Sequence, residues 1–408
     1  MNREDLVEMA KHNIAHIKSN SVDQEEAILK VPASFYTDPA RWEQEREKLF
    51  LRLPIVVALS SELNEPGAYR SVEIMDRPVL VVRQDDGSAQ AFMNMCTHRG
   101  AQVVPVGNGK GSRFSCPYHG WTYGKAGNLI GVASPKEFGE IDKSCYGLPK
   151  LRTFEKSGFV WAILDPSATI AFDTFLSGYD EAIGAFGLDK WHVFGRKRLD
   201  SVNWKLMYDG YVDFYHLPVL HRATFGTKFS NQALNFRWGP HQRITTPDPT
   251  LLKLEGQPEA EWDLKSMLKG VWPMFPNAAL ISIDGRGSAM MFSQIFPGNS
   301  VLEGYSTHVF LTEKELTDEA EREAAEAQFT FLVEVLRDED YTAAEGIQKN
   351  LLTGARDHIL FGRNEPGGQA FHGWIDDIVN AQDDAEVTGL FERAHNRRYV
   401  ADEKAVTA

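Results

Sequence analysis

The chain has 408 residues, of which 43% are hydrophobic and 25% are charged, a composition ordinary for a globular protein with room for two domains. Its formal net charge of −14 argues against nucleic acid and against an anionic membrane surface as partners. No apolar stretch approaches the length of a transmembrane helix, and the N-terminus lacks the apolar core of a signal peptide. Three cysteines are too few for a disulfide framework, which fits a reducing cytoplasm.

The N-terminal segment is predicted to be helical and polar up to about residue 45. Apolar residues recur at helical spacing within Met1–Asn20, and another short amphipathic helix is expected over Arg41–Phe50. We therefore expect residues 1–45 to form a helical segment that packs against the C-terminal part of the chain.

A change to strand-like patterns near residue 50 predicts a small antiparallel β domain over residues 46–165. The apolar run Pro78–Val82 and the segment Ala91–Met93 flank Asp86-Gly87, a dipeptide typical of hairpin turns. Further strands are predicted over Gly120–Tyr123, Leu129–Ile130 and Phe159–Leu164.

Residues 166–408 mix helices and strands, so we predict an α+β fold in which an antiparallel sheet wraps on helices. The clearest helix runs from Thr317, a candidate N-cap, to about Leu336, with apolar residues along one face. A second helix is expected over about Glu339–Leu352. Strands are predicted over Ala278–Ile283, Ala289–Phe292 and His308–Leu311.

Two short motifs in the β domain each pair a cysteine with a histidine. Cys96-Thr-His98 and Cys116-Pro-Tyr-His119 together offer two thiolates and two imidazoles. This donor set suits a Rieske [2Fe–2S] cluster, in which two cysteines bind one iron and two histidines bind the other. Zinc is an alternative, although zinc fingers usually keep both cysteines on one loop and both histidines on one helix. Core cysteines beside unrelated histidines are the remaining alternative.

A third motif lies about a hundred residues further along. Asp213-Phe-Tyr-His216-Leu-Pro218-Val-Leu-His221 supplies two imidazoles, as the 2-His-1-carboxylate sites of non-haem iron enzymes require. On a helix, Asp213 would share a face with His216 and could accept its second ring N–H. Pro218 is expected to end or distort the helix, so that His221 can turn toward the same ion. Without a metal, both histidines would be core residues of a buried helix.

These motifs, in this order, resemble those of the large subunits of Rieske non-haem iron ring-hydroxylating oxygenases. The two Cys/His loops match the family's cluster-binding loops nearly residue for residue, and Asn203-Trp-Lys before the histidine pair matches its mononuclear-iron motif. The resemblance implies a third iron ligand at a late acidic helix start, here Asp340 in Glu339-Asp340. Such an acidic start can also be only a solvated helix cap. Relatives carry Asn or Asp near the iron at the position of Asp209, which implies a supporting role for it.

The resemblance also implies the fold, cofactors and assembly. It implies an antiparallel β Rieske domain over 46–165 and a catalytic domain of the helix-grip, START-like type over 166–408, with a [2Fe–2S] cluster and a mononuclear Fe(II). The family forms head-to-tail trimers, which implies an electron path from His119 through Asp213 to His216 across the subunit interface. A homotrimer and a complex with a small β subunit both remain open.

The electron source is expected to lie outside this chain, which has no dinucleotide-binding fingerprint. Gly107–Gly111 is glycine-rich, but no helical pattern follows it, so it is expected to be a loop. Electrons from NAD(P)H would then come from a separate reductase, with or without a ferredoxin. We expect a terminal oxygenase that uses O₂ to hydroxylate, or oxidatively demethylate, an apolar or aromatic small molecule. The alternative is a Rieske electron-transfer protein without oxygenase activity, which would need neither the histidine pair nor the late carboxylate.

The substrate pocket is expected to be lined from about residues 210–310 and 340–375, which are rich in large apolar side chains. Three arginines could bind a substrate carboxylate or lie on the surface: Arg222, Arg237 and Arg243.

The remaining histidines, among them His12 and His16, are given no ligand role because they lack a partner at ligand spacing. Cys145 is expected to be a packed or inert thiol.

Overall fold

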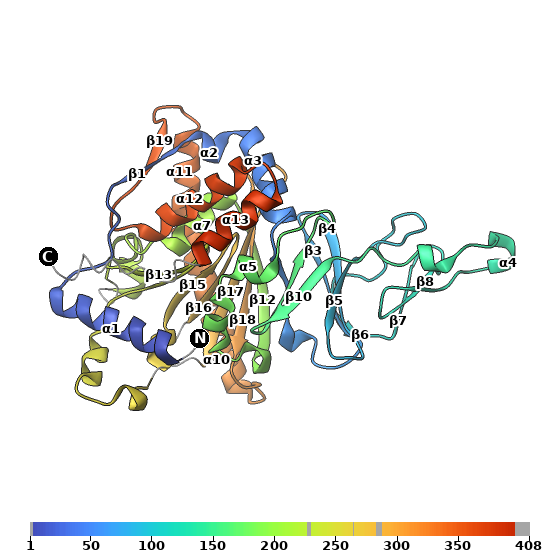
Figure 1. The fold of residues 1–408 in the computed structure, drawn as a ribbon, viewed down its shortest axis with the longest axis horizontal. Helices are drawn as coiled ribbons and strands as arrows, with labels where there is room; N and C mark the ends of the chain where they lie inside the picture. Colours follow the sequence, from blue (N-terminus) through green and yellow to red (C-terminus); the bar gives the residue numbers. More distant parts are fainter. Residues whose placement is uncertain (1–2, 227–229, 264, 283–287, 396–408) are drawn as a thin grey trace. The chain divides into compact units, whose positions relative to one another are not determined.

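The structure is a computed structural model that describes residues 3–226, 230–263, 265–282 and 288–395 (Figure 1). Helices and antiparallel sheets are both present, which confirms the α+β prediction. The chain divides into two compact units. Among the described residues, no helix has the length and apolar character needed to cross a membrane. One unit comprises residues 50–169 and 187–190, and the other comprises residues 1–49, 170–186 and 191–408.

The smaller unit is built from three antiparallel sheets. The hairpin predicted at Asp86-Gly87 is present. The strands predicted near residues 120–123 and 129–130 also pair as a hairpin, which turns at Gly127, where φ is +79° and a Cβ would collide with the ring of Phe92. In sheet order the strands are β10 (Arg152–Lys156), β11 (Phe159–Ile163) and β2 (Ile55–Leu59); β5 (Ala89–Met93), β4 (Arg77–Arg83), β3 (Ala68–Ile74) and β6 (Gly107–Lys110); and β7 (Arg113–Ser115), β8 (Thr122–Gly124) and β9 (Leu129–Gly131).

The glycine-rich segment Gly107–Gly111 is not the predicted loop, because most of it forms strand β6. This strand pairs with β3, and Gly109 lies opposite Tyr69. A Cβ at Gly109 would collide with the phenol ring of Tyr69. Glycine at this position therefore leaves room for the aromatic ring to lie across the strand. Glycine content alone cannot show whether a segment is such a strand or a flexible loop.

The larger unit is built on one seven-stranded antiparallel sheet. Most positions of the central strands are buried on both faces, and these strands combine large apolar side chains with a few buried polar ones. The predicted strands of this region are present, although Ile283 lies outside the described residues. In sheet order the strands are β12 (His192–Ser201), β18 (Gly304–Thr312), β17 (Ala289–Pro297), β16 (Ala278–Ser282), β15 (Gly270–Met274), β14 (His241–Thr245) and β13 (Leu234–Trp238).

Helix α10 (Glu319–Val335) packs on this sheet through Phe329 and Val333. Its N-cap is Asp318 and not the predicted Thr317, because the Asp318 carboxylate accepts a hydrogen bond from the backbone N–H of Glu321 at 3.1 Å. A carboxylate at this end also interacts favourably with the helix dipole.

The two late helices predicted from the sequence form one continuous helical run. A π-helical segment, η8 (Leu336–Tyr341), joins α10 to α11 (Thr342–Leu351). A π-turn shifts the following side chains around the helix axis, and such turns frequently occur at functional sites. Glu339 and Asp340 both lie in this segment.

The N-terminal segment is not wholly helical as predicted. Strand β1 (Leu29–Pro32) pairs with β19 (His358–Phe361), a partner more than 300 residues away that local periodicity cannot reveal. The other elements of this N-terminal segment are helical: α1 (Arg3–Ser19), α2 (Ser34–Thr37), α3 (Pro39–Glu45) and the π-helical η1 (Arg46–Leu51).

The fully buried His308 on β18 makes stability depend on pH. Ser293 Oγ lies 2.9 Å from its Nδ1, and Ser306 Oγ lies 2.8 Å from its Nε2. Burial lowers the pKa of His308 from 6.5 to about 3, so the unfolded chain takes up a proton first as the pH falls. This contribution to the free energy of unfolding is intact above about pH 6.5 and decreases below it, by up to about 1.4 kcal/mol per pH unit. His308→Gln should flatten the fall in stability between neutral and mildly acidic pH in urea unfolding, and an unchanged slope would contradict this account.

Candidate metal centres and active site

The two Cys/His motifs form a matched pair of tight loops in the smaller unit. In each loop, the N–H of the glycine four residues after the cysteine donates to the cysteine carbonyl, from Gly100 to Cys96 at 2.8 Å and from Gly120 to Cys116 at 3.0 Å. Both glycines have positive φ, +82° and +69°, a conformation that side chains with a Cβ rarely adopt. The sequence therefore specifies two loops that present a thiol and an imidazole in the same way.

The side chains of the two loops include buried thiols and imidazoles that lie close together. Cys96 and Cys116 are buried, and the rings of His98 and His119 have centroids 4.8 Å apart. The Nδ1 atoms of both histidines are buried without a hydrogen-bond partner, an unfavourable state unless a metal occupies their lone pairs. Among the described residues, sets of three donor atoms within 4.8 Å of one another occur only outside these two loops. No three of the four loop donors therefore lie close enough together to share one ion. This arrangement disfavours zinc and fits the two irons of a Rieske cluster.

Two aromatic residues of strand β8 and its entry support these loops, and the sequence-based search assigned them no role. The hydroxyl of Tyr123 donates to Cys96 Sγ at 3.2 Å, and Trp121 stacks on His98 with ring centroids 5.0 Å apart. Burial, followed by the hydrogen bond to Cys96, raises the pKa of Tyr123 to about 12, so the hydroxyl keeps its proton. Hydrogen bonds to cluster sulfurs tune the reduction potential.

Asp213 and His216 do not lie on one helix, contrary to the prediction. Helix α7 (Trp204–Val212) ends just before Asp213, which is extended with φ −116° and ψ 123°. His216 precedes the short helix α8 (Leu217–Leu220), and Pro218 lies in its first turn and does not end it. His221 directly follows α8. Proline suits a first helical turn, where its missing N–H has no carbonyl to bond.

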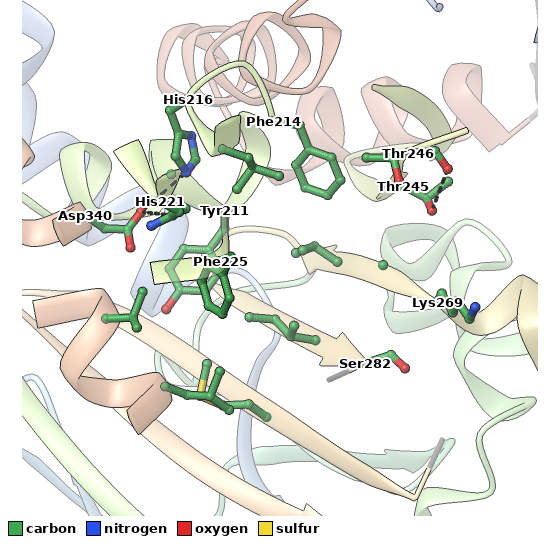
Figure 2. A pocket seen from close by; sticks show the side chains of 18 of the residues that line it. Tyr211, Phe214, His216, His221, Phe225, Thr245, Thr246, Lys269, Ser282 and Asp340 are labelled. Atoms are coloured by element: carbon green, nitrogen blue, oxygen red, sulfur yellow. Dashed lines mark hydrogen bonds and ion pairs between the residues drawn. The ribbon is translucent and has the colours of Figure 1, made fainter. Parts of the chain in front are cut away.

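Three predicted ligands nevertheless meet at one point. Asp340 Oδ1 lies 3.4 Å from His216 Nε2 and 3.4 Å from His221 Nε2, and all three donor atoms lie within 4.8 Å of one another (Figure 2). Two neutral imidazoles and one carboxylate on the same side of an ion leave other positions open, which is the facial triad of non-haem iron oxygenases.

A second carboxylate orients each imidazole. Asp213 Oδ2 lies 3.0 Å from His216 Nδ1, and Glu339 Oε2 lies 2.6 Å from His221 Nδ1. If each Nδ1 donates its proton there, each Nε2 can offer its lone pair to a metal ion that Asp340 also binds. The sequence predicted the Asp213 contact but treated Glu339 only as a neighbour of Asp340. The π-helical segment η8 directs both consecutive carboxylates toward the histidines.

The charges of this cluster also set its protonation. Burial lowers the pKa of His216, but hydrogen bonds and charges of Asp213 and Asp340 outweigh burial and raise the pKa to about 9. The pKa of His221 is raised as well, with burial opposed mainly by Asp340. Metal binding to these imidazoles must therefore displace protons, so a metal competes better as the pH rises.

Asp209 belongs to a different buried network. Its Oδ2 accepts a hydrogen bond from the Tyr36 hydroxyl at 2.9 Å, and its Oδ1 lies 2.8 Å from His372 Nε2. Tyr36 belongs to the N-terminal segment and His372 to α12 (Pro366–Asn380). Asp209 thus links α7 to these two segments.

A cavity of about 660 Å³ opens beside the three converging donors. Its wall near the histidines is largely apolar, with Tyr211, Phe214 and Phe225, whereas Thr245 and Lys269 lie at the other end (Figure 2). Residues from the first predicted range, 210–310, line the cavity as expected. Of the second predicted range, 340–375, the described lining includes only Asp340 and Tyr341. Helix α10 contributes a further part of the wall through Gln328, Phe331, Leu332 and Val335.

The three arginines have different environments. Arg243 is buried in the cavity wall, and its Nη2 donates to the carbonyl of Lys269 at 3.0 Å. Arg222 is exposed, and Arg237 pairs with Glu25. Cys145 is exposed and not packed as expected.

Comparisons with known proteins agree with this geometry. The family model "Rieske [2Fe-2S] domain" matches residues 54–154, and "Ring hydroxylating alpha subunit (catalytic domain)" matches residues 188–381. The oxygenase subunit of carnitine monooxygenase from Escherichia coli K12 is 28% identical over 332 residues, which cover 79% of this chain and 84% of that protein. The large subunit of anthranilate 1,2-dioxygenase from Acinetobacter baylyi is 29% identical over 297 residues, or 71% of this chain and 59% of that protein.

Solved structures share the fold. A quaternary ammonium Rieske monooxygenase superimposes with a TM-score of 0.72 at 20% identity, covering 86% of this chain and 95% of that one. Naphthalene 1,2-dioxygenase with bound indole gives 0.70 at 20% identity, covering 90% and 96%. The chain belongs to the Rieske-type ring-hydroxylating oxygenases and is a large (α) subunit of that family. It is therefore an oxygenase, and its cofactors are a Rieske [2Fe–2S] cluster and a mononuclear iron.

Proposed function

We propose that this chain is the terminal component of an oxygenase system that hydroxylates, or oxidatively demethylates, a small molecule with O₂. Electrons would come from NAD(P)H through a separate reductase, with or without a ferredoxin. The observation that carries the proposal is the convergence of His216 Nε2, His221 Nε2 and Asp340 Oδ1 at one end of a cavity of about 660 Å³. The cluster would supply single electrons, and the iron would supply the site of O₂ chemistry.

The residue assignments follow from the donor atoms. Cys96, His98, Cys116 and His119 would hold the cluster within a Rieske domain over about 46–165. His216, His221 and Asp340 would hold the iron within a catalytic domain over about 166–408, on which residues 1–45 pack. Asp213 and Glu339 would keep the two Nε2 atoms directed at the ion.

Asp213→Ala should leave both metal centres largely bound but lower product formation about 10–100-fold, because His216 loses the acceptor that orients its ring. Single-turnover oxidation of the reduced cluster, measured together with iron content, tests this expectation. Asp200→Ala, which removes an exposed carboxylate of β12, is the control. Normal single-turnover rates in the Asp213 variant would refute the proposed role.

The cavity favours a substrate with an apolar body and a polar end. Aromatic side chains of Tyr211, Phe214 and Phe225 surround the space near the metal donors, where a carbon atom must be placed for oxidation. Arg243 and Lys269 lie in the wall at the far end and could bind an anionic group. We therefore propose an apolar or aromatic substrate that carries an acidic group distant from the oxidised carbon.

A quaternary ammonium substrate is the second candidate. The named relatives include carnitine and choline monooxygenases, and aromatic faces near the metal donors could bind a trimethylammonium group by cation–π interaction. In this pose the ammonium group would lie at the aromatic end, next to the carbon that is oxidised.

A substrate panel assayed with a surrogate reductase distinguishes these candidates. Product formation is scored against uncoupled peroxide for aromatic acids, quaternary ammonium compounds and neutral aromatics. Lys269→Met should raise KM for acidic substrates about tenfold or more and leave neutral ones unchanged, whereas Lys253→Met, at an exposed lysine, should change neither. Failure of every class to couple O₂ consumption to product would overturn the proposed oxygenation.

The family resemblance also supports a homotrimer, with or without a small β subunit, in which the cluster of one subunit serves the iron of the next. Light scattering on the purified protein should then give three times the chain mass of 45.8 kDa. Cysteines outside a disulfide framework fit a reducing compartment, and we propose the cytoplasm.

A further inference from the structure

A second group of two histidines and one carboxylate lies in the N-terminal segment. Helix α1 (Arg3–Ser19) places His12 and His16 one turn apart, so their imidazoles share a face of the helix. The chain after the helix returns Asp23 to that face. Asp23 Oδ1 lies 3.0 Å from His12 Nε2 and 3.2 Å from His16 Nε2, and the three donor atoms lie within 4.8 Å of one another.

The arrangement repeats the one at the active site. In both groups, two Nε2 atoms face a single carboxylate oxygen, at 3.4 Å from Asp340 and at 3.0 and 3.2 Å from Asp23. Donor atoms that each lie about 2.1 Å from one metal ion are about 3.0 to 3.4 Å apart when the angle at the metal is between octahedral and tetrahedral. The spacing at Asp23 therefore suits a shared ion.

Neighbouring groups hold these donors in place. Ser21 Oγ lies 2.8 Å from His16 Nδ1, and the second oxygen of Asp23 accepts the backbone N–H of Asn235 at 2.7 Å. The two imidazole side chains are only 8% and 4% exposed, so water competes little for their nitrogens. Burial opposes ionisation of Asp23, but the histidines outweigh it and lower its pKa strongly, so it stays a carboxylate.

We propose that His12, His16 and Asp23 form a second metal site, which binds a divalent ion of the zinc class through Nε2, Nε2 and Oδ1. Two imidazoles and one carboxylate are a usual zinc donor set, and water would complete the coordination. The site joins α1 to β13, because Asp23 is hydrogen-bonded to Asn235 of that strand. Strand β13 pairs with β14, whose Arg243 and Thr245 line the active-site cavity. The ion would thus stabilise one wall of the cavity without taking part in the chemistry.

The test uses the full chain with its active-site triad disabled, so that zinc cannot be counted there. The His216→Ala/His221→Ala variant is dialysed against micromolar Zn²⁺, and zinc per chain is measured by elemental mass spectrometry. We expect about one zinc per chain and a Tm that rises with zinc concentration. Adding His16→Ala should abolish both effects. Adding Asp23→Asn, which keeps the size and one acceptor oxygen, should weaken zinc binding at least tenfold.

The control is His192→Ala in the same background, which removes an exposed imidazole of β12 and should keep the zinc. Circular dichroism and the cluster's absorption verify that each variant is folded. Absence of zinc from the His216→Ala/His221→Ala protein would show that the group is only a hydrogen-bonded His–Asp–His cluster and would overturn the proposal. Retention of zinc after His16→Ala and Asp23→Asn would overturn it equally.

Discussion

His216→Ala and His221→Ala should each lose the mononuclear iron and essentially all product formation, while the protein keeps its brown cluster. Each substitution leaves one imidazole and Asp340 as the only remaining donors of the set, too few to retain iron against exchange with water. Iron content should therefore fall from about three to about two atoms per chain, with unchanged cluster absorption.

His192→Ala is the matched control, because it removes an exposed imidazole from the same unit and should change neither iron nor activity. Iron content that stays unchanged in both the His216 and His221 variants would show that the iron lies elsewhere. Loss of cluster absorption in those variants would instead indicate general unfolding, and the assignment would then be tested by His221→Gln, which keeps the side chain polar.

Glu45→Ala should lower the free energy of unfolding by about 3–5 kcal/mol, the largest stability effect we expect from a single substitution. Glu45 and Lys205 form an ion pair in which both side chains are fully buried. The same carboxylate accepts a hydrogen bond from Trp204 Nε1 at 3.1 Å and pairs with Arg41 at 3.1 Å. Burial already lowers the pKa of Lys205 against the opposing charge of Glu45, so removing that charge leaves a buried ammonium without compensation.

Urea unfolding of the iron-loaded protein measures this effect. Glu43→Ala, which removes an exposed carboxylate two residues earlier, should cost less than about 1 kcal/mol. The double variant Glu45→Ala/Lys205→Met should recover much of the loss, because it removes both buried charges together. If Glu45→Ala were no more destabilising than Glu43→Ala, the buried pair would not anchor α3 to α7.

The sequence predicted features that depend on short spacings. A cysteine and a histidine two or three residues apart in a turn cannot lie far from each other, so Cys96/His98 and Cys116/His119 indicated their chemistry before any fold was known. The same holds for the hairpin at Asp86-Gly87, where two residues decide the turn.

Predictions failed where a distant partner decides the local conformation. The segment Leu29–Pro32 is a strand only because His358–Phe361 pairs with it, and Gly107–Lys110 is a strand because β3 lies beside it. His12 and His16 received no role because their common partner, Asp23, lies beyond the end of their helix.

The sequence by itself determined the donor types, their local spacing and the family to which the chain belongs. Only the tertiary structure decided that Asp340 faces both imidazoles, that Glu339 holds His221, and that α10 forms a wall of the cavity. The physical reason is distance. A metal site requires donor atoms within a few ångströms, and the carboxylates of η8 are more than a hundred residues from the histidines, so folding alone brings them together.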